Sequence, residues 1–162
     1  MISYDLYSET NPAFVSFLIY RFVRAYKASD YEDAPHFSLV YLAIPIATSN
    51  RLQMTFSSTN VKTGLLSWIN RYPEIRIGLM NDVEAARDFT TEGLRAAIHS
   101  ELLAFGPNGS LQLGVAKPLA ENIKTKLPSN PKNAVSRVER LAKWMASAGS
   151  PSHIFSLLEV AP

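Results

Sequence analysis

The sequence predicts a mainly α-helical domain that carries one β-hairpin. Apolar residues recur at helical spacing in most segments, and a Gly-Pro-Asn-Gly turn separates two short apolar segments near residues 103–115. The 162 residues are 47% hydrophobic, which suits one domain with a sizeable core, because a chain of about 150 residues buries roughly two thirds of its unfolded surface. Three helices before the hairpin indicate a winged-helix-like core, and two extra helices follow it. We therefore treat residues 1–162 as a single domain.

The first helix is expected over residues 12–27. Asn11 is a typical N-cap, and Pro12 fits the first helical position, where its missing N–H costs no hydrogen bond. Polar residues form one narrow stripe along this helix: Ser16, Tyr20, Arg24 and Lys27, with Arg21 beside it. A membrane span needs about 20 mostly apolar residues, and three charges in the last two turns exclude one here. A helix that is apolar over most of its circumference is expected at the centre of an all-α core.

Residues 36–47, "HFSLVYLAIPIA", are continuously apolar, and such a pattern does not separate helix from strand. Pro45 would end or kink a helix near Ala43 or Ile44. We favour a helix over about residues 35–44.

Three helices are predicted between this segment and the hairpin. The first is capped by Ser58, Thr59 or Asn60 and buries Val61, Leu65, Trp68 and Ile69. Tyr72-Pro73-Glu74 ends it and opens the second, which carries Ile75, Leu79, Val83 and Ala86 on one side. The third begins near Thr90 and directs Leu94, Ile98, Leu102 and Phe105 toward the core.

The hairpin and the C-terminal helices follow. Pro107-Asn108 suits the centre of a type I turn with Gly109 in a left-handed conformation, and Leu111, Leu113 and Val115 alternate as in a half-buried strand. Residues 117–133 contain three prolines and are expected to form a loop. The next helix buries Val135, Val138, Leu141, Ala142 and Met145 and is expected to end at Gly149. Ser150-Pro151 opens a last short helix with Ile154, Phe155, Leu157 and Leu158.

The sequence contains no cluster of catalytic or metal-ligating residue types. His36, His99 and His153 lie far apart without a metal-binding spacing, and the seven glycines form no phosphate-binding loop. Trp68 and Trp144 are expected in the core, and Asp82, Glu84 and Asp88 are interpreted as solvated surface. We expect neither an enzyme nor a protein with a cofactor, a metal or a small-molecule substrate.

The charge pattern singles out one segment. The net charge of +2 predicts no nucleic-acid affinity by itself, but residues 117–143 hold seven bases and two acids. Candidate contacts for a partner or for DNA are Lys132, Arg137, Arg140 and Lys143. A solvated helix face is the alternative interpretation. The absence of cysteine fits a reducing cytoplasm, and the first eleven residues carry Asp5 and Glu9 without a basic stretch, so no signal peptide is expected.

Three segments taken together resemble a known family. They are "NPAFVSFLIYRFVRAY", "GLLSWINRYPEIRIGL" and "RVERLAKWMASAGSPSHIFSLLEVAP". The pattern is similar to that of the middle components of bacterial ABC three-component systems, of which Lamassu is a relative. The resemblance covers most of the chain, and the closing segment is its most specific part.

The resemblance implies a role in antiviral or anti-plasmid defence. Such systems pair an SMC/Rad50-like ABC ATPase with a middle component and a toxic effector, often a nuclease. By this resemblance the chain is a non-catalytic adaptor that joins ATPase to effector. From the residues themselves we expect that Arg137, Arg140 and Lys143, spaced three apart on the predicted helix, face the same way and meet either an acidic surface of a partner or the backbone of DNA that the complex holds. A small winged-helix DNA-binding regulator that uses the basic segment 117–143 is the alternative hypothesis. The two hypotheses differ in salt dependence: DNA binding by a regulator weakens steeply as salt rises, whereas docking of an adaptor on its protein partner through an apolar interface does not.

Overall fold

The computed structural model describes residues 11–28, 33–117 and 121–161. Within these ranges the chain forms six α-helices and one two-stranded antiparallel sheet, with short 3₁₀ turns between them. The elements are α1 Pro12–Lys27, α2 Val40–Thr48, α3 Leu65–Arg71, α4 Leu79–His99, β1 Leu103–Phe105, β2 Leu111–Leu113, α5 Ser129–Ala148 and α6 Pro151–Leu158. The mainly α-helical class, the hairpin and the two helices after it are confirmed, whereas the winged-helix arrangement stays a prediction.

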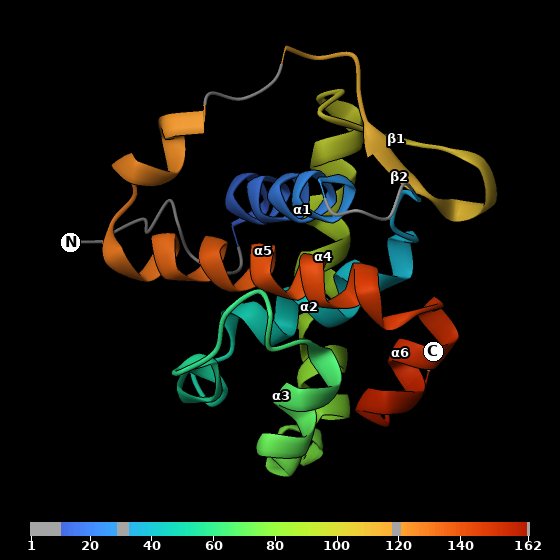
Figure 1. Cartoon of the computed structure of the whole chain (residues 1–162). Coiled ribbons are helices and arrows are strands. Elements are labelled where there is room, and N and C mark those ends of the chain that lie inside the picture. Colours follow the sequence, from blue (N-terminus) through green and yellow to red (C-terminus); the bar gives the residue numbers. More distant parts are fainter. Residues whose placement is uncertain (1–10, 29–32, 118–120, 162) are drawn as a thin grey trace.

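Helix α1 is the centre of the core. It packs mainly on α4 and α5, and Figure 1 shows α4 crossing it steeply while α5 runs along it. Asn11 caps the helix, since its side chain accepts a hydrogen bond of 2.9 Å from the amide of Ala13. The polar stripe is largely buried rather than solvated: Ser16, Tyr20 and Arg21 are all enclosed. The buried Arg21 is accommodated because it meets a carboxylate on α5, described below.

The crossing of α1 and α4 depends on a glycine. A Cβ atom placed on Gly93 would lie 2.2 Å from Cγ1 of Val15 and 3.2 Å from the backbone nitrogen of Ser16. Any side chain at this position would therefore push the two helices apart. Gly93 costs α4 some helix propensity, but it allows the backbones of α1 and α4 to approach closely.

Helix α2 extends further than predicted. A 3₁₀ turn, Phe37–Leu39, leads into α2, which continues through Pro45 to Thr48. The expected end near Ala43 or Ile44 is therefore wrong. Pro45 removes one backbone hydrogen bond, but nearly every residue of the helix is buried against neighbouring helices, and this packing holds the segment helical.

The helix predicted from Ser58–Asn60 begins later, at Leu65 after Gly64. Val61 is consequently 51% exposed instead of buried. The preceding residues form a 3₁₀ turn, Gln53–Phe56, and an extended loop. Leu65, Trp68 and Ile69 are buried as predicted.

The two tryptophans lie in the core, as expected. Both are fully buried and share an aromatic cluster with Phe56, whose ring stacks on Trp144 at 5.9 Å. The indole of Trp68 donates to the carbonyl of Thr55, and the indole of Trp144 donates to the carbonyl of Asn60. The cluster therefore fixes residues 55–60 against α3 and α5.

The second and third predicted helices are a single helix, α4. Residues 73–76 form only a 3₁₀ turn, and Gly78 in a left-handed conformation precedes the helix. No glycine or proline interrupts residues 79–92, so the predicted break near Thr90 has no physical cause. The helix ends at His99, because Glu101 adopts a left-handed conformation with φ of 62°. Phe105, expected to face the core from a helix, is a strand residue and 56% exposed.

The hairpin lies where it was predicted, directly after α4. Leu103 pairs with Leu113, and Phe105 pairs with Leu111. Gly109 is left-handed as predicted, and Asn108 has a positive φ as well. The half-buried alternation is wrong beyond Leu111, since Leu113 and Val115 are 43% and 86% exposed. Residues 35–36 cover the outer edge of β2, through a bond of 2.8 Å from the amide of Leu111 to the carbonyl of Pro35.

Helix α5 starts earlier than expected, so the predicted loop over residues 117–133 is wrong in part. A 3₁₀ helix, Glu121–Lys126, precedes α5, and Pro131 is accommodated in the first turn, where amide groups have no helical partner. The predicted inward residues of α5 are all buried: Val135, Val138, Leu141, Ala142 and Met145. Gly149 has φ of 111° after the helix, and Ser150 caps α6 as predicted.

Candidate interaction surface on helix α5

All four basic residues singled out by the sequence lie on α5 and are partly exposed. Lys132, Arg140 and Lys143 share the outer face, and Arg137 lies at its edge toward α2. With a rise of about 1.5 Å per residue, the distance along the helix from Lys132 to Lys143 is about 16 Å. The structure therefore places all four candidate residues on α5, including Lys132, which was expected in the loop before this helix.

Two of these cations also hold the fold together. The Nε atom of Arg137 donates to the carbonyl of Ala47 at 2.7 Å, at the last turn of α2. Nη1 of Arg140 donates to Oγ1 of Thr59 at 2.9 Å and to the carbonyl of Phe56 at 3.3 Å. Burial lowers the pKa of both guanidinium groups, and the charge of Arg140 lowers the pKa of Arg137 further. Both groups bind neutral acceptors, so their positive charges are not compensated at these contacts.

The end of α3 and the loop beside α5 contribute two further cations, which sequence spacing did not reveal. Nη1 of Arg71 donates to the carbonyl of Ser58 at 3.2 Å, next to the residue that binds Arg140. Lys62 is exposed two residues after Asn60, which the indole of Trp144 holds. We define the basic surface as Lys62, Arg71, Lys132, Arg137, Arg140 and Lys143. Among the described residues, none of these six side chains forms an ion pair with a carboxylate.

The acidic residue of α5 is neutralised elsewhere. Glu139 binds Arg21 of α1 at 2.8 Å and Lys124 at 2.7 Å. Burial alone would raise the pKa of the Glu139 carboxyl, but the hydrogen bonds from Lys124 and Arg21 outweigh it, and the pKa is lowered. Glu139 therefore ties α5 to α1 and to the 3₁₀ helix before α5. Its charge is matched twice at that position and does not offset the basic surface.

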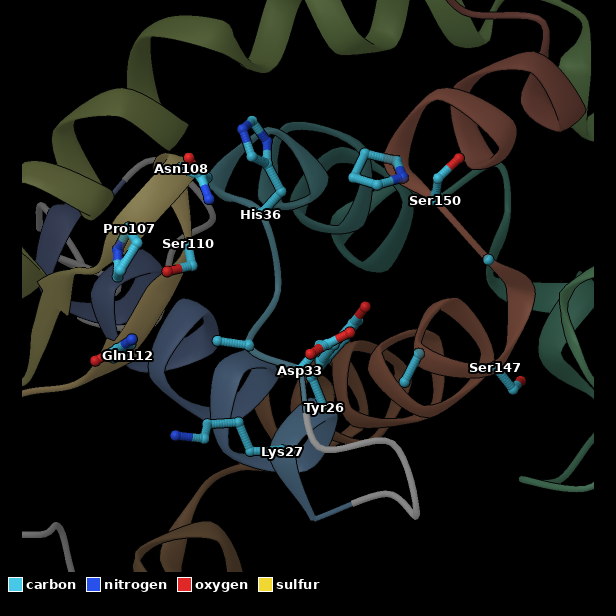
Figure 2. Close-up of a pocket in the computed structure, with 14 residues that line it drawn as sticks. Tyr26, Lys27, Asp33, His36, Pro107, Asn108, Ser110, Gln112, Ser147 and Ser150 are labelled. Carbon is cyan, nitrogen blue, oxygen red and sulfur yellow. The ribbon is translucent and has the colours of Figure 1, made fainter.

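A polar cleft of about 730 Å³ opens beside the hairpin (Figure 2). It lies between the C-terminal ends of α1 and α5, the turn of the hairpin and the start of α6. Its lining includes Tyr26, Lys27, Asp33, Ser147 and Ser150. Burial, and then the charge of Asp33, raises the pKa of the Tyr26 hydroxyl. The cleft presents hydroxyl and amide groups without an organised catalytic set.

His36 and Ser38 form a pair that the sequence analysis did not consider. Nδ1 of His36 lies 2.7 Å from Oγ of Ser38 and accepts a hydrogen bond of 3.2 Å from the Ser38 amide. The amide occupies the lone pair that a general base would need. The pair therefore caps the 3₁₀ turn Phe37–Leu39 instead of activating the serine.

The other candidate chemistry does not assemble in the described parts of the chain. No three His, Asp or Glu side chains gather there in a way that would hold a metal ion. Asp82 is paired with Arg51, while Glu84 and Asp88 are exposed. A bilayer-spanning helix, of sufficient length and apolar character, is likewise absent from residues 11–28, 33–117 and 121–161.

Comparison with known proteins gives one match. A family model described as "ABC-three component (ABC-3C) system Middle Component 3" matches residues 3–162. No curated protein matches the chain, and no solved structure does.

Proposed function

The chain belongs to the ABC-three component system Middle Component 3 family, and on this premise we propose that it is a non-catalytic adaptor. Its two partners are an SMC/Rad50-like ABC ATPase and an effector protein, a nuclease in the simplest case. The assembly acts in the cytoplasm in defence against phages or plasmids, in the manner of Lamassu. The family name implies a system of several components, and this is the observation that carries the proposal.

The surface of the chain supports a role in binding two partners. The basic surface is one exposed region of distinctive chemistry, and the hairpin provides another, apolar one. Phe105, Leu113 and Val115 are 56%, 43% and 86% exposed on or next to the hairpin. Figure 1 shows the hairpin on the other side of α5 from the loop that carries Lys62. An adaptor needs two separate surfaces, and interfaces between proteins are centred on apolar and aromatic side chains.

Co-purification tests the proposal. The chain, with an affinity tag, is co-expressed with the ATPase and the effector of its own system, and captured proteins are quantified. We expect both partners to be retained. The double variant Phe105→Ser, Val115→Ser should lose one of them, because it removes the two most exposed apolar side chains on or next to the hairpin. The control Met54→Ser changes a side chain that is 75% exposed outside both surfaces and should retain both partners. Capture of neither partner by the unmodified chain would contradict the proposal.

The non-catalytic part of the proposal has its own test. The purified chain should show no ATPase, nuclease or hydrolase activity and should bind no stoichiometric metal. A nuclease activity that persists through stringent purification would overturn it.

The basic surface also supports the second hypothesis, a small DNA-binding regulator. A winged helix commonly reads DNA with the helix before its hairpin. Here that helix is α4, where Arg95 is already bound to Glu92 at 2.6 Å and Glu84 and Asp88 are exposed. The mixed charge of α4 disfavours sequence-specific reading, so the adaptor is our preferred function.

A further inference from the structure

We propose that the basic surface binds the phosphate backbone of duplex nucleic acid while the chain is part of its complex, an inference that rests on the proposed adaptor function. The charge of the surface favours a polyanion. Its six cations lie on α5, at the end of α3 and in the loop before α3, and the side-chain hydrogen bonds of Arg71, Arg137 and Arg140 go to neutral acceptors. Glu139, the carboxylate of α5, is bound by Arg21 and Lys124 instead. Uncompensated cations of this kind attract a polyanion strongly.

Exposed hydroxyl and amide side chains surround the cations. Ser57, Ser58 and Asn60 are exposed between Arg71 and Arg140. Hydroxyl and amide groups beside Arg and Lys are the usual contacts to phosphate oxygens.

The loop and the cations beside it are held in place by contacts within the fold. The carbonyl groups of Thr55 and Asn60 are held by the buried Trp68 and Trp144. Arg140 uses Nη1 for the loop, and a guanidinium group has five N–H donors, so further donors stay available. The loop and α5 thus form a fixed platform. The basic residues of α5 span about 16 Å, and B-DNA carries one negative charge per about 1.7 Å of its axis. The surface is therefore long enough to contact several phosphates at once.

The six cations differ in whether their side chains also hold the fold together. Arg137 and Arg140 hold α2 and the loop, so their replacement would confuse binding with stability. Lys62, Lys132 and Lys143 have no side-chain hydrogen bond or ion pair with a described residue. They are the correct positions for a variant that changes charge alone.

The experiment measures binding of a short fluorescein-labelled DNA duplex by anisotropy, for the chain alone and for the assembled complex. For the unmodified chain, about five phosphate contacts predict a slope of log K against log salt of about −4 to −5 between about 50 and 200 mM salt. The triple variant Lys62→Gln, Lys132→Gln, Lys143→Gln should reduce the steepness of this slope by about 2 to 3 and weaken binding at least about tenfold at low salt. The matched control Lys27→Gln, Arg87→Gln, Lys117→Gln loses the same charge from exposed positions outside the basic surface.

The outcomes separate this inference from the adaptor function. The inference is supported if the triple variant binds DNA weakly and with a shallower salt slope, while the control binds normally. Both variants must melt like the unmodified chain. Equal losses in the two variants would overturn it, because the effect would then be one of net charge. Unchanged DNA binding by the triple variant, or no DNA binding by chain and complex, would overturn it as well. Loss of ATPase or effector capture without any DNA binding would assign the surface to an acidic protein and leave the adaptor function standing.

Discussion

The close approach of α1 and α4 makes the replacement of Gly93 by alanine a sensitive test of the core. In an open helix this change stabilises by about 1 kcal/mol, because alanine has the higher helix propensity. Here the new Cβ would lie 2.2 Å from Cγ1 and 2.6 Å from Cβ of Val15. Overpacking costs about 1–3 kcal/mol, and the upper end applies because neither the Cβ of Val15 nor the backbone of Ser16 can swing away. We expect a net destabilisation of about 2 kcal/mol.

A double-mutant cycle measured by urea unfolding checks the cause. Val15→Ala removes the closest atom, so the double variant Val15→Ala, Gly93→Ala should be more stable than the sum of the single changes by at least about 1 kcal/mol. Ala85→Gly, at an exposed position of α4, calibrates the propensity of this helix and should cost about 1 kcal/mol. Stabilisation by Gly93→Ala alone would refute the described packing of α1 on α4.

Two further predictions concern polar contacts and backbone strain. Glu139→Gln should destabilise the fold by about 2–3 kcal/mol at neutral pH, because Arg21 is left buried without its carboxylate. Burial raises the pKa of the Glu139 carboxyl, but the hydrogen bonds from Lys124 and Arg21 outweigh it, so the folded pKa is lowered. The stabilisation by this carboxylate is therefore fully present above the pKa of a free glutamate, about 4.3, and is lost as pH falls through the folded pKa. Chemical unfolding from about pH 6 to about pH 3 should show a shallower decline of stability for Glu139→Gln than for the unmodified chain. Glu101→Gly should raise stability by about 1 kcal/mol, since Glu101 has φ of 62° and its side chain forms no ion pair with a described residue. A lower melting temperature for Glu101→Gly would contradict the left-handed helix end.

Local signals explain which parts of the fold were predictable. Asn11 and Ser150 are strong caps, each followed by proline, so the starts of α1 and α6 could be placed from the sequence. The end of α4 could not, because glutamate gives no signal for the left-handed conformation that Glu101 adopts. The continuation of α2 through Pro45 is due to burial among helices, which no local pattern records.

The candidate surface, like the fold, could be predicted from the sequence only in part. Helical spacing predicted one shared face for Arg137, Arg140 and Lys143, because they belong to one helix, whereas Lys132 was expected in the loop before it. Sequence alone could not reveal the internal bonds of Arg140, because they reach Thr59 and Phe56, which lie 81 and 84 residues away along the chain. It also could not reveal that Arg71 bonds to Ser58 in the same loop, because no local pattern records this contact. The resemblance to the family, by contrast, was based on three sequence segments taken together, and the family match over residues 3–162 confirms it.

The central claim is that the chain connects two other proteins. Reconstitution of the three-component assembly tests this claim most directly. The ATPase and the effector are mixed with and without the chain, and the masses of the species are measured by size-exclusion chromatography with light scattering. The account predicts that ATPase and effector elute in one complex only when the chain is present. Association of ATPase with effector to the same extent in its absence would contradict the account.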